Sequence, residues 1–171
     1  MIMIKRSIEN IIKNQLHDGR AIVVMGARQV GKTTLLRELF AGGETEVLWM
    51  SGDEPDVRGA FENITSTRLK AIIGNHRVVV IDEAQRIENI GIKLKLITDQ
   101  MPEVQLLATG SSSFDLANKI NEPLTGRKFE YQMFPISTNE IYKSSGYLDV
   151  KRLLETRLIY GSYPDVLSNI G

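Results

Sequence analysis

The chain has 171 residues, no cysteine, and 21 basic against 21 acidic side chains, so its formal net charge at pH 7 is zero. This length suffices for one domain with a buried core. The lack of cysteine excludes disulfides, thiolate metal sites and cysteine nucleophiles. Zero net charge excludes a global basic field for nucleic acid, although it leaves room for a local basic patch.

Two further exclusions concern membranes and metal-binding histidines. No apolar run approaches the ~20 residues that cross a membrane, and the first residues lack the order of a signal peptide. We therefore expect a cytoplasmic protein with no membrane partner. The two histidines, His17 and His76, stand far apart and lack the spacing of metal ligands, so we interpret both as surface or loop residues.

Strands and helices alternate in the predicted order of elements. Helical spacing of isoleucines predicts a first helix over residues 4–17. The later predicted elements are a strand over 21–25, a helix over 34–40, a strand over 46–50, helical residues 56–73 that divide around 65–67, a strand over 78–81, a helix over 90–101, a strand over 104–109, a short helix over 114–120, a strand over 128–134, a helix opened by the capping box 137–140, and a last helix over 150–160. This alternation predicts an α/β fold with a doubly wound, mostly parallel sheet.

Residues 26–33 match the pattern G-x-x-x-x-G-K-[ST] of a phosphate-binding loop, or P-loop. A strand leads in and a helix leads out, which makes a chance match in a glycine-rich turn the weaker interpretation. The glycines let backbone N–H groups converge on a phosphate at a helix N-terminus. Lys32 would contact the β- and γ-phosphates, and the Thr33 hydroxyl would ligate Mg²⁺. The predicted nucleotide-binding residues are Gly26, Ala27, Arg28, Gln29, Val30, Gly31, Lys32, Thr33 and Thr34.

Two acids, Asp82 and Glu83, end the strand over 78–81. Its four β-branched residues are typical of a strand that is buried on both faces. An acid at the carboxyl end of a parallel strand lies where ligands bind in open α/β sheets. We expect Asp82 to hold Mg²⁺ through water, as a second metal residue beside Thr33, and Glu83 to polarise the attacking water. The alternative is a pair of acids favoured by the dipole of a helix N-terminus.

The position of this acid pair narrows the class of nucleotide site. A whole strand–helix unit over 46–73 separates it from the P-loop, and the guanine-specific pattern Asn-Lys-x-Asp is absent from the sequence. These features favour an ATPase with a catalytic glutamate over a GTPase. A small-molecule kinase is a weaker interpretation, because no additional substrate motif supports it. Asp53, after the second strand, reaches the same edge of the sheet, where a turn-forming role is the simpler expectation.

Six segments together resemble a known family, the prokaryotic ATPases of the AAA superfamily that carry a C-terminal domain of unknown function. These segments are residues 26–34, 80–85, 109–112, 124–127, 134–137 with Glu140, and 160–164. The resemblance implies a P-loop NTPase fold of three layers, α/β/α, around a five-stranded sheet of order 5-1-4-3-2. It also implies ATP and Mg²⁺ as cofactors. Members of the family are longer, so we expect one ATPase domain over 1–171 without the family's C-terminal domain.

Within this domain we distinguish the helix over 4–17, a nucleotide-binding core over 20–136 and a helical C-terminal segment over 137–171. The resemblance also suggests two kinds of catalytic side chain. Thr109 or Ser111, beyond the fourth strand, would contact the γ-phosphate or the attacking water, with capping of the next helix as the alternative. Arg127 would stabilise transition-state charge in cis or on a neighbour's site, with a surface salt bridge as the alternative.

The predicted function is Mg²⁺-dependent ATP binding and hydrolysis, coupled to a conformational change that drives a downstream domain or partner. The alternative is a nucleotide-gated interaction module that binds ATP with negligible turnover. Glu83 favours hydrolysis, because a pure switch does not need a carboxylate that polarises water. A homo-oligomer would suit Arg127 acting in trans, and nucleic acid stays open as a partner of the full-length protein alone.

Overall fold

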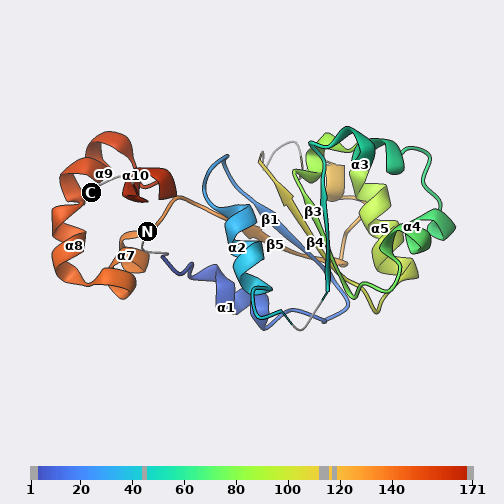
Figure 1. Cartoon of the computed structure of the whole chain (residues 1–171), viewed down its shortest axis with the longest axis horizontal. Coiled ribbons are helices and arrows are strands. Elements are labelled where there is room, and N and C mark those ends of the chain that lie inside the picture. The colour runs from blue at the N-terminus through green and yellow to red at the C-terminus, as the bar shows by residue number, and fades with distance from the viewer. Residues whose placement is uncertain (1–3, 44–45, 112–115, 117–118, 169–171) are drawn as a thin grey trace.

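Five parallel strands form the centre of the computed structural model, which describes residues 4–43, 46–111, 116 and 119–168 (Figure 1). The strands are β1 (Ala21–Met25), β2 (Val47–Ser51), β3 (Val78–Asp82), β4 (Gln105–Gly110) and β5 (Lys128–Gln132). Their order across the sheet is β2-β3-β4-β1-β5, and each neighbouring pair is parallel. Read from the other edge this is 5-1-4-3-2, so the predicted α/β sheet and its order are confirmed.

Two hydrophobic cores, one on each face, make the fold three-layered. Alternate side chains of β1 point to opposite faces: Ile22 and Val24 pack with α1 and α2, whereas Val23 and Met25 pack with α3, α4 and α5. The helices are α1 (Ile8–Lys13), α2 (Lys32–Leu39), α3 (Pro55–Ala60), α4 (Ser66–Ile73) and α5 (Ile90–Gln100). Strands β1 and β4 are buried along their whole length, because helices cover both of their faces.

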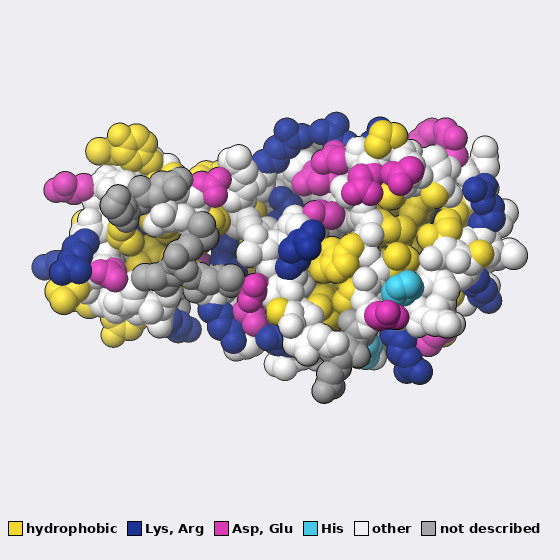
Figure 2. Space-filling model, viewed as in Figure 1, with side chains coloured by type: hydrophobic (Ala, Val, Ile, Leu, Met, Phe, Trp, Pro, Cys, Tyr) yellow, Lys and Arg dark blue, Asp and Glu magenta, His cyan; other side chains and the backbone are white. Residues whose placement is uncertain are grey.

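Four short helices follow the sheet and form a separate lobe (Figure 1). They are α7 (Thr138–Ser145), α8 (Tyr147–Arg152), α9 (Leu154–Tyr160) and α10 (Pro164–Ser168), and we call residues 137–168 the C-terminal helical segment. Figure 2 shows this lobe joined to the main body by a narrower waist, with hydrophobic side chains on its surface. Leu158 is 77% exposed and Ile159 72%.

The structure corrects the expected bounds of two helices. The helix predicted over 150–160 is divided between α8 and α9 at Leu153, whose ψ of −5° departs from the value of about −42° in a regular α-helix. The helix predicted over 4–17 spans only Ile8–Lys13, since the next residues form tighter turns, in which the Gln15 N–H bonds to the Ile12 carbonyl and the Leu16 N–H to the Lys13 carbonyl. Residues 4–7, which we call the N-terminal arm, precede α1.

Other predicted elements have a simpler outcome. The helical region 56–73 divides into α3 and α4 as expected, with Thr65 capping the second helix. The capping box of Ser137 and Glu140 is present at the start of α7. The helix predicted over 114–120 lies largely outside the described residues. Within the part of the chain that the structure describes, no helix has the length and apolar character needed to cross a membrane.

Candidate functional site

The P-loop connects β1 to α2 at the carboxyl edge of the sheet, and two of its positions require glycine. Gly31 lies immediately before α2 with φ +96°, a left-handed conformation that glycine adopts without strain. Gly26 lies against the chain that follows β5, because a Cβ atom there would be 2.3 Å from the Met133 carbonyl oxygen. The loop is therefore a backbone cradle at a helix N-terminus, which is the geometry that binds phosphate.

Lys32, the first residue of α2, is buried and folds back over this loop. Its Nζ donates hydrogen bonds to the carbonyl oxygens of Gly26 at 2.9 Å and Ala27 at 2.8 Å. Burial lowers the pKa of the Lys32 ammonium, and the nearby Glu83 and Asp82 carboxylates oppose that shift. An ammonium has three protons, so one remains for a phosphate oxygen.

Thr33 and Asp82 meet directly, although 49 residues separate them. The Thr33 hydroxyl donates to Asp82 Oδ2 at 2.7 Å. The other oxygen, Oδ1, accepts from the Glu83 N–H at 3.1 Å and from the Thr109 hydroxyl. A hydroxyl beside a carboxylate is a set of hard oxygen ligands that fits Mg²⁺, which keeps several waters and takes its other ligands from phosphates.

Glu83 follows β3 in a left-handed conformation, with φ 47°. Its Oε2 accepts a hydrogen bond from the Gln85 side chain at 2.6 Å, and Gln85 also donates to Ser111 Oγ at 2.7 Å. Gly52, just after β2, packs closely against this turn. Its N–H donates to the Asp82 carbonyl at 2.8 Å. A Cβ atom on Gly52 would be 2.4 Å from the Glu83 carbonyl oxygen, so a larger residue would not fit. The two acids are thus held on a rigid turn.

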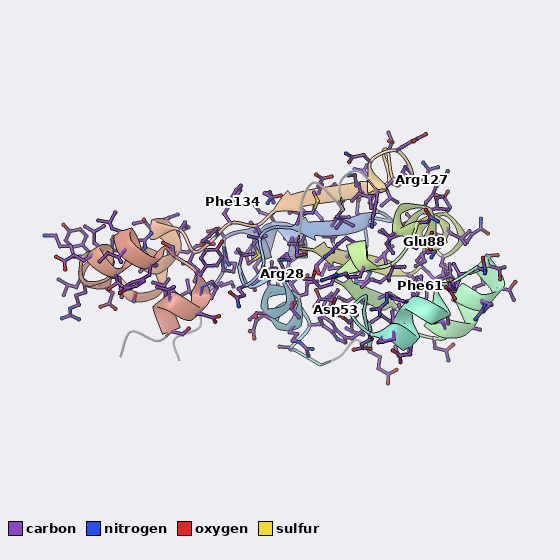
Figure 3. All side chains as sticks on the ribbon, turned by 90° about the horizontal axis from the view of Figure 1, so that it is seen from above. Arg28, Asp53, Phe61, Glu88, Arg127 and Phe134 are labelled. Carbon is purple, nitrogen blue, oxygen red and sulfur yellow. The ribbon has the colours of Figure 1, made fainter. Side chains whose placement is uncertain are left out.

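A cleft of about 540 Å³ lies beside the P-loop and Glu83. Its walls include P-loop residues, Glu83, the ion-paired side chains of Asp53 and Arg86, and Pro164 and Asp165 from α10. Arg28 is exposed and lines the same cleft; Figure 3 shows it in the same part of the molecule as Asp53. A larger cavity of about 940 Å³ adjoins the cleft, between α2, the N-terminal arm and the C-terminal helical segment.

The two predicted sensor residues contact the acid pair, directly or through Gln85. Thr109 is fully buried, and its hydroxyl contacts Asp82 and accepts from the Glu83 N–H at 3.1 Å. Ser111 reaches Glu83 through Gln85. A role for either residue in sensing phosphate stays a prediction, and the capping alternative concerns a helix start outside the described residues.

Arg127 lies at the amino ends of the strands, whereas the P-loop lies at their carboxyl ends. The Arg127 carbonyl oxygen accepts from the N–H of Ala21, the first residue of β1, whereas the P-loop follows the end of β1. A strand of five residues, at about 3.3 Å each, separates the two ends by roughly 16 Å. Figure 3 likewise shows Arg127 far from Arg28. Of the two alternatives for a catalytic role, this placement argues against action in cis.

The structure contains the salt bridge that was the alternative for Arg127: its Nε lies 2.6 Å from Asp99 Oδ1. Action on a neighbour's site stays a prediction.

Several residues of the site escaped the sequence analysis. Gly52 and Arg86 carry no motif, and Gln85 stands in the segment 80–85 but received no role. Pro164 belongs to the segment 160–164, and its place on the cleft wall follows only from the path of the chain. Asp165 lies one residue beyond. The signal for Gln85 was its spacing of two residues from Glu83, at the end of a buried strand.

Comparisons with known proteins agree with this geometry. A family model described as an AAA domain matches residues 18–142. Two uncharacterized proteins, of Mycobacterium bovis and Mycobacterium tuberculosis, are each 28% identical over 151 residues. These matches cover 85% of this chain and 32% of each relative, so the chain spans about a third of their length.

A solved structure shares the fold. It is a signal transduction ATPase with numerous domains that has a tetratricopeptide repeat sensor, from Pyrococcus horikoshii, with a TM-score of 0.57 and 13% identity. The likeness covers 94% of this chain and 28% of that one. Since the family model matches well over half of the sequence, this chain belongs to the AAA domain family.

Proposed function

We propose that this chain binds ATP with Mg²⁺ and hydrolyses its β–γ phosphoanhydride, in the manner of an ATPase. The observation that carries the proposal is the contact of the Thr33 hydroxyl with Asp82 Oδ2, at 2.7 Å, with Glu83 as the next residue. This contact joins a hydroxyl and a carboxylate that would suit Mg²⁺, and it lies beside a candidate base and the P-loop. A phosphate site alone would need neither acid.

Each side chain has a defined part in the proposed reaction. The P-loop N–H groups and the N-terminus of α2 bind the phosphates, and Lys32 adds a charge at the β- and γ-positions. Thr33 and Asp82 would hold Mg²⁺, which neutralises phosphate charge when it is bound. Glu83 would orient a water and accept its proton as the water oxygen attacks the γ-phosphorus. The bond from that phosphorus to the bridging oxygen would then break, and ADP and inorganic phosphate would leave.

Contacts between lobes suggest how the nucleotide state would reach the rest of the protein. Pro164 and Asp165 of α10 line the nucleotide cleft, so a bound nucleotide would contact the C-terminal helical segment. Arg6 of the N-terminal arm donates to the Val30 carbonyl of the P-loop at 2.7 Å and pairs with Glu140 of α7. We propose that this lobe moves with the nucleotide state and passes the motion to a downstream domain or partner.

One observation favours the second candidate function, a nucleotide-gated interaction module with negligible turnover. Arg127 does not reach the P-loop of its own chain, so it would not stabilise transition-state charge in cis. In such a module, bound ATP would set the position of the C-terminal helical segment, and a partner would respond to that position. Assembly into a homo-oligomer would reconcile the two functions, if a neighbour supplies the arginine.

The test is ATP binding and phosphate release by the full-length protein, with Mg²⁺ and with excess chelator. We expect release only with Mg²⁺. Lys32→Ala should weaken ATP binding about tenfold or more, because charge-assisted contacts of this kind contribute about 1.5–3 kcal/mol. Lys95→Ala, on the exposed face of α5, is the matched control. Tight binding without release would establish the gated module, and unchanged affinity in Lys32→Ala would refute the assignment of the P-loop.

A further inference from the structure

Gln85 lies two residues beyond Glu83, and its amide joins the ends of two strands. Nε2 donates to Glu83 Oε2 at 2.6 Å and to Ser111 Oγ at 2.7 Å. These two bonds use both protons of the amide. Glu83 follows β3 and Ser111 follows β4, so one side chain bridges neighbouring strand ends.

The oxygen of this amide, Oε1, is buried without a hydrogen-bond partner. Among the described residues, Gln85 Oε1 is the one buried side-chain nitrogen or oxygen that finds no hydrogen-bond partner. Burying a polar atom without a partner lowers stability. Turning the amide by 180° would set Oε1 against the Glu83 carboxylate, so the charge of Glu83 favours the orientation observed. The fold alone would be served better by an apolar side chain here.

The surroundings of the amide are closely packed. A Cβ atom on Gly110 would lie 3.0 Å from Gln85 Oε1 and 2.5 Å from Leu116 Cδ2, so glycine leaves the room that the amide occupies. The Lys119 ammonium donates to the Gln85 backbone carbonyl at 2.7 Å and fixes the main chain as well. The amide therefore has little freedom to leave Glu83.

The far end of the bridge is adjacent to the P-loop. Gly110, the residue before Ser111, accepts a hydrogen bond from the Gly26 N–H at 3.3 Å, and it is paired with Met25 of β1. Ser111 Oγ accepts its bond from Gln85, so the proton of that hydroxyl points elsewhere. Gln85 thus connects the candidate base to the strand end that touches the first residue of the P-loop.

We propose that Gln85 is a positioning residue for ATP hydrolysis, which fixes the Glu83 carboxylate through Nε2 and ties its orientation to Ser111 at the end of β4. This inference rests on the proposed function, because it assigns a supporting side chain to the proposed base. It predicts that the N–H donors of the amide serve catalysis, and that the unpaired oxygen lowers the stability of the fold.

The test replaces Gln85 by methionine, which has a similar length and volume but offers no N–H. In the full-length protein, Gln85→Met should lower kcat about tenfold or more, part of the 10²–10⁴-fold that a positioned base contributes. ATP affinity should stay within about twofold, and the melting temperature should be unchanged or higher, because an unpaired polar atom is removed. Gln100→Met, an exposed change at the end of α5, is the matched control and should alter none of these.

A double-mutant cycle separates positioning from an independent role. In a Glu83→Gln background, Gln85→Met should lower kcat no further, because residues that act as a unit are not additive. A full additional loss in the double variant would overturn the inference. So would a fall in melting temperature with weakened ATP binding in both Gln85→Met and Gln85→Leu, since that would make Gln85 structural.

The outcomes also separate this inference from the proposed function. If the unaltered protein hydrolyses ATP and Glu83→Gln does not, unchanged kcat in Gln85→Met overturns the inference alone. If the unaltered protein releases no phosphate with Mg²⁺ and ATP, the proposed hydrolysis fails and the inference fails with it.

Discussion

Arg6 and Glu140 form an ion pair across 134 residues of sequence, with Arg6 Nε 3.2 Å from Glu140 Oε1. The Arg6 guanidinium also donates to the carbonyl oxygens of Val30 and Phe134. Glu140 in turn accepts from the backbone N–H groups of Ser7 at 2.7 Å and Ser137 at 2.8 Å. This junction joins the N-terminal arm, the P-loop and the C-terminal helical segment, which is the connection that the proposed coupling needs.

Removing the guanidinium should therefore destabilise the protein. We expect Arg6→Ala to lower the free energy of unfolding by about 2–3 kcal/mol, because it removes hydrogen bonds to a charged, largely buried carboxylate. Urea denaturation followed by circular dichroism measures this. Arg152→Ala, which breaks the exposed pair with Asp149 at 3.3 Å, should change it by less than about 1 kcal/mol. Equal effects of the two substitutions would contradict the structural role of Arg6.

The same junction should make stability depend on pH. Burial by itself would raise the pKa of Glu140, but hydrogen bonds from the Ser137 and Ser7 backbones and the charge of Arg6 outweigh it and lower the pKa below its ordinary 4.5. The contribution of a lowered pKa is present above the unfolded value and is lost as pH falls through the folded one.

We therefore expect the difference in unfolding free energy between the unaltered protein and Glu140→Gln to be constant near pH 7. It should shrink as pH falls below about 4.5. Unfolding free energies at a series of pH values measure this difference. A difference that does not change with pH would show that the charge of Glu140 is not what stabilises the junction.

A methyl group at the first residue of the P-loop should abolish its function. Gly26→Ala would place a Cβ atom 2.3 Å from the Met133 carbonyl oxygen, so the loop or the chain after β5 must shift. We expect ATP affinity, measured by calorimetry, to fall at least about tenfold. Gly42→Ala, where a Cβ atom meets nothing within 4 Å, is the control. Normal binding by Gly26→Ala would mean that the close approach does not shape the phosphate cradle.

Arg127 lies at the amino ends of the strands, away from the P-loop, so we expect it to affect catalysis only in an assembly of chains. We expect Arg127→Ala to bind ATP within about twofold of the unaltered affinity, since such arginines act on charge that develops during transfer. If Arg127 acts in trans, the Arg127→Ala protein alone should not turn over ATP. Mixing it with Lys32→Ala, which keeps Arg127, should then restore part of the activity. Full turnover by Arg127→Ala alone would leave the ion pair with Asp99 as its role.

Sequence patterns predicted the parts of the molecule that depend on local order. The strand, P-loop and helix around Lys32 follow one another along the chain, and the buried run that ends in Asp82 and Glu83 identifies itself by composition. The alternation of elements predicted the α/β sheet, and the family resemblance supplied its strand order. Each of these depends on neighbours in sequence, or on segments whose order recurs.

Contacts between distant segments could not be predicted in this way. Arg6 and Glu140 are both ordinary charged residues, and only folding brings them together. The orphaned oxygen of Gln85 depends on what lies around it in space, and the division of a helix at Leu153 depends on a backbone turn that apolar periodicity does not reveal. Arg127 illustrates the same limit. Its residue type suited a catalytic role, but it lies at the amino ends of the strands, whereas the P-loop lies at their carboxyl ends.

The most direct test of the account is phosphate release by the full-length protein with and without Glu83→Gln, at saturating ATP and Mg²⁺. The substitution keeps the shape of the side chain and removes its ability to accept a proton. We predict that kcat falls by about 10²–10⁴-fold, while ATP affinity stays within about twofold. Unchanged turnover in Glu83→Gln, or loss of ATP binding together with turnover, would contradict the assignment of Glu83 as the base of an ATPase.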